Sequence, residues 1–91
     1  MNKAEFTRAL AEKSGLSSKD AATALNATLE IIQDSLRDGE SVAFTGFGTF
    51  EVKARAARIG RNPKTKEPIE IPASKTPAFR PGKVLKEAVN Q

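Results

Sequence analysis

Apolar residues in the first 40 positions recur at the spacing of amphipathic α-helices. Asn2 and Glu5 stand three residues apart, as in a capping box, and Gly15 supplies a helix stop. Ser17 is a residue type that caps helices, and a second stop follows at Gly39. The apolar faces between these signals are Phe6, Ala9 and Leu10, then Ala21, Leu25, Leu29, Ile32 and Leu36. Residues 1–40 are therefore predicted to form a helical hairpin.

At Val42 the period changes to two, because apolar and polar residues begin to alternate as they do in β-strands. The alternation passes through Gly46-Phe47-Gly48, breaks over residues 60–65 and resumes at Ile69. This pattern predicts a β-hairpin and then a second hairpin, whose tip holds Asn62-Pro63.

A short C-terminal helix is predicted to open at Pro81-Gly82, because proline is favoured in the first turn of a helix. The chain is therefore expected to be a single α+β domain spanning residues 1–91. Its predicted parts are a helical body (1–40), a three-stranded antiparallel β-sheet (41–80) extended into a β-ribbon arm of about 53–75, and the helix at 81–91.

Large apolar side chains are scarce in this chain. Its 91 residues include five Phe but no Trp and no Tyr, so a single copy has little material for a core. Because Cys and His are absent, disulfides are excluded and the commonest metal ligands and catalytic bases are missing. We therefore expect self-association, and no enzymatic activity, cofactor or metal. No apolar run has the length of a signal peptide or membrane helix, so a cytoplasmic protein is expected.

Positive charge is concentrated in the second half of the chain. The formal net charge is +4, yet residues 1–40 hold five cations against seven acids, whereas residues 41–91 hold ten against four. Residues 53–66 contain no acid and six cations, namely Lys53, Arg55, Arg58, Arg61, Lys64 and Lys66. Such a run is often only a solvated surface, but here the cations alternate with small apolar residues in the predicted arm. Because a two-stranded ribbon fits DNA grooves and brings cations to phosphates, double-stranded DNA is the predicted partner.

Two further features each allow two interpretations. Arg80, Lys83 and Lys86 recur at spacings of three, which predicts one side of the final helical segment, with Lys75 at the base of the arm. They either extend the cationic track or are ordinary exposed positions of an amphipathic helix. Pro63 either only forms the turn or acts as an apolar wedge of the kind that minor-groove proteins insert between base steps.

The phenylalanines also have two interpretations, as a base-stacking platform or as a core. Stacking platforms mix aromatic residues with cations, but the arm has no aromatic residue, so a core shared between subunits is favoured. A nucleotide-binding loop at Gly46-Phe47-Gly48 is disfavoured because no third glycine and no helix follow. The predicted dimer core comprises Phe44, Phe47, Phe50, Phe79, Leu29, Ile32 and Leu36.

Three segments in order, Gly46–Phe50, Gly60–Thr65 and Ile71–Lys83, resemble the HU/IHF family of histone-like DNA-bending proteins. The resemblance covers essentially all 91 residues. It implies an intertwined homodimer or heterodimer with a helical body and two β-ribbon arms that reach into the minor groove, a mode for which HU and IHF are themselves known examples. It assigns intercalation to Pro63. The DNA contacts that it implies are Arg55, Arg58, Arg61, Asn62, Lys64 and Lys66 in the arm, and Lys3, Lys75, Arg80, Lys83 and Lys86 in the body, with Lys53 added from the charge pattern.

Two residues of the predicted arm depart from the family pattern. Lys66 stands where the family usually has glycine, and Pro68 lies in the returning strand, so we expect an altered tip and an interrupted strand there. The resemblance implies a nucleoid-associated protein that bends, wraps and compacts DNA without sequence specificity and prefers nicked, bent or distorted duplexes. Residues 55–58 and 71–75 resemble the HU branch of the family. A sequence-preferring, IHF-like factor and a binder of structured RNA are the alternatives.

Overall fold

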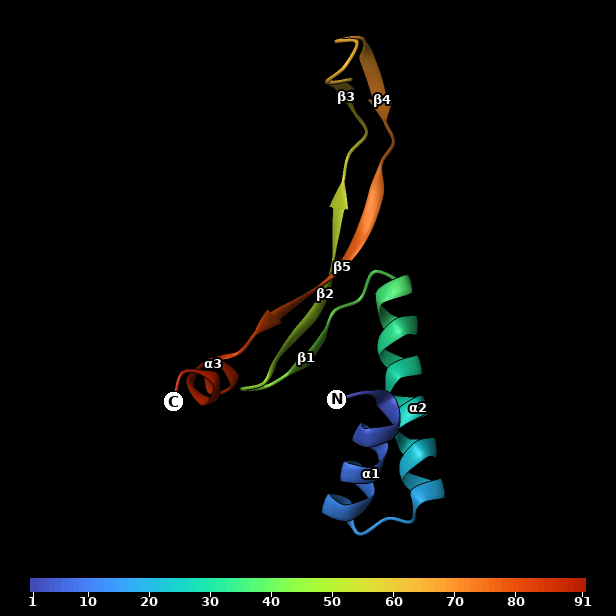
Figure 1. Ribbon diagram of the computed structural model, residues 1–91, viewed down its shortest axis with the longest axis vertical. Helices are drawn as coiled ribbons and strands as arrows, with labels where there is room; N and C mark the ends of the chain where they lie inside the picture. The colour runs from blue at the N-terminus through green and yellow to red at the C-terminus, as the bar shows by residue number, and fades with distance from the viewer. The chain divides into compact units, whose positions relative to one another are not determined.

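The computed structural model describes residues 1–91, and Figure 1 shows the elements in chain order. They are α1 (Lys3–Ser14), α2 (Ser18–Arg37), β1 (Val42–Phe44), β2 (Gly48–Arg55), β3 (Arg58–Arg61), β4 (Pro68–Ile71), β5 (Ser74–Pro81) and α3 (Lys83–Val89). The chain divides into two compact units, Met1–Ser35 and Leu36–Gln91. This order of helices and antiparallel strands confirms the predicted α+β class.

The two N-terminal helices begin and end at the residues that local capping chemistry predicts. The Asn2 side-chain oxygen accepts a hydrogen bond from the Glu5 N–H at 2.9 Å, which satisfies one free donor of the first turn of α1. Gly15 ends α1 in the left-handed conformation, with φ of 78°. The Ser17 hydroxyl accepts from the Asp20 N–H at 3.1 Å at the start of α2. The predicted helical hairpin is confirmed.

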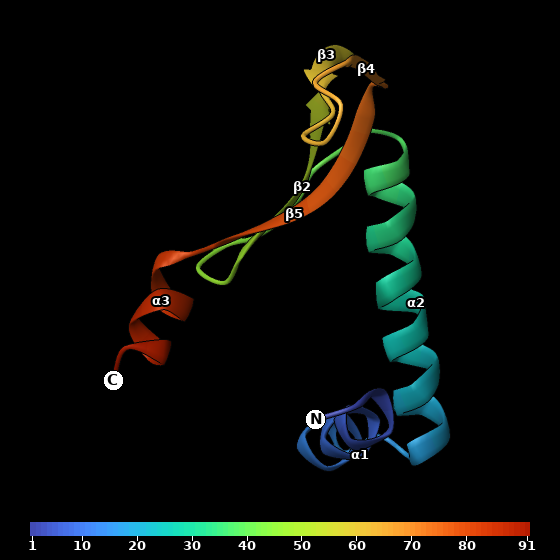
Figure 2. The ribbon, with the colours of Figure 1, turned by 45° about the horizontal axis from the view of Figure 1, so that its top comes forward.

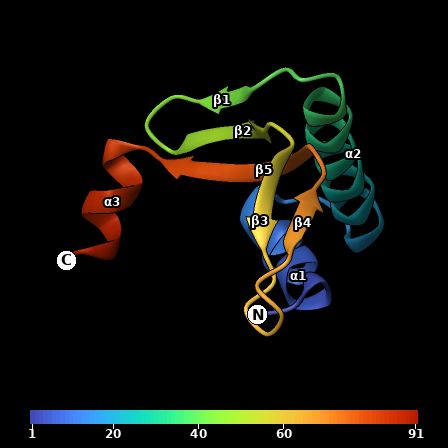
Figure 3. The same ribbon diagram turned by 90° about the horizontal axis from the view of Figure 1, so that it is seen from above.

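β1, β2 and β5 form a three-stranded antiparallel sheet with β2 in the centre, which Figure 3 shows side by side. β5 pairs with β2 over its whole length, from Gly48 opposite Pro81 to Arg55 opposite Ser74. β1 covers only the first residues of β2. The end of the β2–β5 pair therefore continues beyond β1 as two strands.

β3 and β4 form a separate two-stranded sheet that follows the β2–β5 pair, as Figures 1 and 2 show. Three details of the predicted arm are wrong. The strand pattern does not run unbroken through residues 56–57, and Gly60 lies within β3 rather than in the turn. Nor is the returning strand interrupted at Pro68, which is the first residue of β4 and pairs with Arg61. The interruption falls at residues 72–73, where Pro72 has no N–H to donate to a ladder.

The start of α3 packs against the turn between β1 and β2. The Gly82 N–H donates to the Phe47 carbonyl at 2.7 Å, and the Leu85 N–H donates to the Gly46 carbonyl at 3.3 Å. A Cβ on Gly82 would lie only 2.6 Å from the Gly46 carbonyl oxygen, so the approach requires glycine. The helix begins at Lys83 and not at residue 81 as predicted, because Pro81 pairs with Gly48 in the sheet.

Very little apolar surface is buried within the single chain. Ala21 is the only buried apolar residue, whereas Phe44, Phe47 and Phe79 are 43%, 51% and 39% exposed. A domain normally buries its large apolar side chains, so these exposed rings are an uncovered core rather than an ordinary surface. No helix is both long enough and apolar enough to cross a membrane.

Candidate nucleic-acid interface

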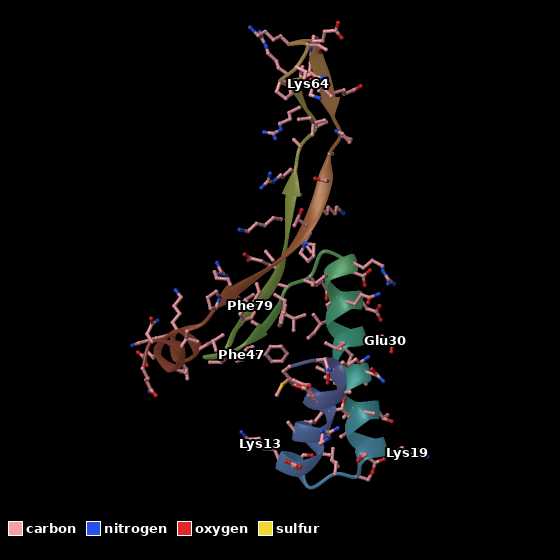
Figure 4. All side chains as sticks on the ribbon, viewed as in Figure 1. Lys13, Lys19, Glu30, Phe47, Lys64 and Phe79 are labelled. Carbon is pink, nitrogen blue, oxygen red and sulfur yellow. The ribbon has the colours of Figure 1, made fainter.

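The tip of the ribbon is a tight turn in which Asn62 takes part in three hydrogen bonds. Asn62 donates its N–H to the Glu67 carbonyl at 2.9 Å, and its own carbonyl accepts from the Lys66 N–H at 2.7 Å. The Asn62 side-chain oxygen accepts from the Lys64 N–H at 2.9 Å. Pro63 follows directly and is exposed, and Figure 4 marks Lys64 in the same turn. The structure thus places the candidate wedge Pro63 at the end of the arm, as the sequence predicted.

Lys66 closes this turn in a conformation that L-amino acids avoid. Its φ is 60°, and it is the one residue other than glycine with positive φ. The left-handed conformation costs a side-chain-bearing residue about 1–2 kcal/mol, because Cβ approaches the following carbonyl. We expected an altered tip at Lys66. The structure places this lysine, with its charge, in a backbone conformation that suits glycine.

The two arginines of β3 lie on opposite faces of the ribbon. Arg58 pairs with Ile71, and Arg61 pairs with Pro68 three residues further along. Because successive side chains of a strand point to opposite faces, an odd separation places Arg58 and Arg61 on different sides. Ile59 lies on the Arg61 side and is 77% exposed. Each face of the ribbon therefore carries an arginine, and the face of Arg61 also carries the exposed side chain of Ile59. The ribbon has no packed core of its own.

A second group of cations shares one face of the three-stranded sheet. The β2–β5 register puts Lys53, Arg55 and Arg80 on the face opposite Phe50. The prediction that Arg80 belongs to the final helical segment is wrong, because residue 80 is paired within β5. Lys75 is paired with Ala54 and so lies on the face of Phe50 instead.

Glu51 lies among these cations and was not singled out from the sequence. Its Oε2 is 3.8 Å from Nη2 of Arg80, and the two side chains are 27% and 69% exposed respectively. The spacing of two residues along β2 puts Glu51 on the same face as Lys53. The register between β2 and β5 then brings Arg80 next to Glu51 on that face. An exposed ion pair of this kind contributes little stability, so its main effect is on where the guanidinium is held.

The remaining predicted contacts lie elsewhere. Lys83 and Lys86 are exposed on α3, three residues apart and so on neighbouring turns of the helix. Lys3 is the first residue of α1 and belongs to the N-terminal unit. No group of acidic residues is arranged to hold a metal ion.

Four of the five phenylalanine side chains gather on the face of the sheet that is turned away from Lys53 and Arg55. The ring of Phe50 lies 4.8 Å from Phe79 and 6.4 Å from Phe44, and Phe47 lies 5.7 Å from Phe79, measured between centroids. Figure 4 labels Phe47 and Phe79 in this cluster. Apart from Lys75, the predicted DNA-contacting cations of β2 and β5 lie on the other face, which favours the interpretation as a core over a base-stacking platform. Beside it is an open hollow of about 360 Å³ lined by Thr45, Gly46, Phe47, Val84, Leu85 and Ala88.

Comparison with known proteins shows similarity along nearly the entire chain. The sequence profile of the family described as Bacterial DNA-binding protein matches residues 1–90. DNA-binding protein HU of Geobacillus stearothermophilus is 60% identical over 89 residues, which are 98% of this chain and 99% of that protein. DNA-binding protein HU 1 of Bacillus subtilis (strain 168) is 56% identical over 98% of this chain and 97% of its own length. An Anabaena HU-DNA cocrystal structure matches with a TM-score of 0.85 and 48% identity, covering 98% of this chain and 97% of that one.

Proposed function

The chain belongs to the family of bacterial DNA-binding proteins, and we propose that it binds and bends double-stranded DNA as a histone-like architectural protein of the nucleoid. The observation that carries this proposal is the ribbon of β3 and β4, which has an arginine on each face and Pro63 exposed at its tip. A narrow ribbon of this kind enters a groove, and its cations meet the phosphates on either side.

Binding with little regard to sequence follows from the type of contacts that the ribbon offers. Lysine and arginine bind the phosphates, which carry no sequence information, and the affinity then comes mainly from counterion release. The cations proposed for these contacts are Lys3, Lys53, Arg55, Arg58, Arg61, Lys64, Lys66, Lys75, Arg80, Lys83 and Lys86.

Pro63 is the residue that we propose to bend the DNA. An apolar wedge that enters a base step unstacks it at a cost of a few kcal/mol, and the bent duplex then offers contacts to more of the protein. A nick, gap or existing bend lowers this cost, so distorted duplexes should bind more tightly than intact ones. The relative from Anabaena was crystallised with DNA, which fits the same class of partner.

We also propose that two copies of the chain form the binding unit. The exposed rings of Phe44, Phe47 and Phe79 need a covering surface, and Phe50 lies in the same cluster. A second copy is the occupant we propose, because the family resemblance implies an intertwined dimer and the chain buries so little by itself. The remaining residues proposed for this core are Leu29, Ile32 and Leu36.

The proposal is tested by comparing the wild type with Pro63→Ala on a short duplex carrying a fluorophore at each end. Energy transfer reports the bend, and titrations at several salt concentrations give the salt slope. Pro63→Ala keeps every cation, so the slope should be unchanged while the bend and the preference for nicked DNA both decrease. A wild-type protein that leaves the duplex straight, or that prefers structured RNA at matched salt, would contradict the proposed function.

A further inference from the structure

We infer that Asn62 is a positioning residue, which locks the tip turn and so fixes the direction in which Pro63 points. The inference rests on the proposed function, because the wedge role of Pro63 is part of that proposal. It assigns to Asn62 a role within the protein in place of the DNA contact that the family resemblance implied.

The hydrogen bonds of Asn62 carry the inference. Three of its polar groups are used inside the turn: the N–H to Glu67, the carbonyl to Lys66 and the side-chain oxygen to Lys64. Asn62 is half-buried, whereas residues 63–67 are all exposed. Because Asn62 is hydrogen-bonded within the turn and is less exposed than the residues that follow it, we assign it a structural role in the turn.

The bond from the Lys64 N–H to the Asn62 side chain spans Pro63. When the side-chain oxygen of Asn accepts a hydrogen bond from the N–H two residues ahead, it forms an Asx-turn, which has the geometry of a backbone turn. The residue before proline is already restricted to extended conformations, and proline itself has a fixed φ. The Asx-turn adds the constraint on the far side of Pro63, so the ring is held from both directions.

Holding the ring matters because an ordered wedge loses less conformational entropy when it enters a base step. A net hydrogen bond of about 1 kcal/mol corresponds to a factor of about five in an equilibrium constant. Losing the side-chain bond should therefore weaken binding to bent or nicked duplex by about fivefold. The salt slope should stay the same, since no charge is removed.

The test compares the wild type with Asn62→Ala, Asn62→Asp and Pro63→Ala. Asn62→Ala removes the acceptor, whereas Asn62→Asp keeps an oxygen in the same place but lacks the amide N–H groups that a direct DNA contact would use. Titrations of nicked duplex at several salt concentrations give the affinity and the salt slope of Asn62→Ala. Bend angles are measured by energy transfer at saturating protein, which compensates for the weaker binding expected from the negative charge of Asp. In the free proteins, exchange of the Lys64 amide proton reports the turn itself.

We expect Asn62→Ala to reduce the bend and to speed exchange at Lys64, and Asn62→Asp to keep both near the wild-type values. A wild-type bend in Asn62→Ala overturns the inference. Equal loss in Asn62→Ala and Asn62→Asp also overturns it, because the amide donors would then contact DNA directly. If instead the wild type does not bend DNA, or Pro63→Ala bends it fully, the proposed function fails, and the Lys64 amide still decides whether Asn62 orders the turn.

Discussion

Gly15 and Gly82 show two different reasons for which a chain requires glycine. Gly15 has a φ of 78° and nothing within 4 Å of the place where a Cβ would be, so only its backbone conformation excludes other residues. Gly82 has an ordinary φ of −86°, but a Cβ there would lie 2.6 Å from a backbone oxygen. The first is a helix stop and the second is a packing contact between α3 and the β1–β2 turn.

The difference predicts unequal effects of alanine at the two positions. Gly82→Ala should destabilise the protein by about 3 kcal/mol, because the clash is with backbone that has no rotamer to change. Gly15→Ala should cost about 1 kcal/mol, the strain of a left-handed residue. Urea unfolding at one fixed protein concentration measures both, and equal losses would show that α3 moves freely away from the turn.

At the scale of single elements, the β2–β5 pair decides which charged side chains are neighbours. Glu51 and Arg80 are far apart in sequence and belong to different strands, yet their side chains lie 3.8 Å apart. Arg80 is then shared between a carboxylate on its own sheet and any phosphate that approaches. In the proposed complex with DNA, the Glu51 carboxylate competes with the phosphates for this guanidinium.

Glu51→Gln should tighten DNA binding at low salt, because it removes the acid from the face of Lys53 and Arg55 and releases Arg80. Titration of a labelled duplex measures the change. Glu12→Gln in α1 is the matched control, since it changes the net charge equally at a residue outside this sheet. In an Arg80→Gln background the gain should shrink. An equal gain in DNA affinity in Glu12→Gln would show that the effect of Glu51→Gln comes only from the change in net charge.

The ribbon of β3 and β4 is expected to be the most easily cleaved element. It is a two-stranded sheet with breaks at residues 56–57 and 72–73, and such sheets are marginal by themselves. Limited trypsin digestion should cut first at Arg58, Arg61 and Lys64, and bound duplex DNA should protect these sites. Cleavage that begins in α1 or α2 while the ribbon stays intact would show that the ribbon is packed.

For the whole molecule, the decisive quantity is the surface that one chain leaves exposed. Within the sheet unit, Phe44, Phe47 and Phe79 are 43%, 51% and 39% exposed, although a folded domain normally buries its large apolar side chains. A second copy that covered these rings would bury them as the apolar parts of obligate dimer interfaces are buried.

Folding should therefore depend on association. The thermal midpoint should rise with protein concentration, because a transition from folded dimer to unfolded monomers follows mass action. Differential scanning calorimetry over a hundredfold range of concentration, with light scattering for the mass, makes the measurement. A folded monomer at micromolar concentration, with a midpoint that does not change, would contradict the dimer.

The sequence by itself determined the features that short stretches of chain control. Asn2, Ser17 and Gly15 place the ends of the helices, because capping bonds join residues no more than four positions apart. Asn62-Pro63 likewise places the tip of the arm. The change from helical spacing to strand alternation at Val42 was also sufficient to predict the α+β class.

The tertiary structure decided everything that depends on strand register. Arg80 follows the spacing of Lys83 and Lys86, which fits a helix, but pairing with β2 keeps residue 80 in a strand. Register also placed Lys75 on the aromatic face and brought Glu51 to Arg80. These outcomes depend on contacts between residues distant in the chain, whose alignment is selected by the packing of the whole sheet, whereas spacing along one strand is compatible with several alignments.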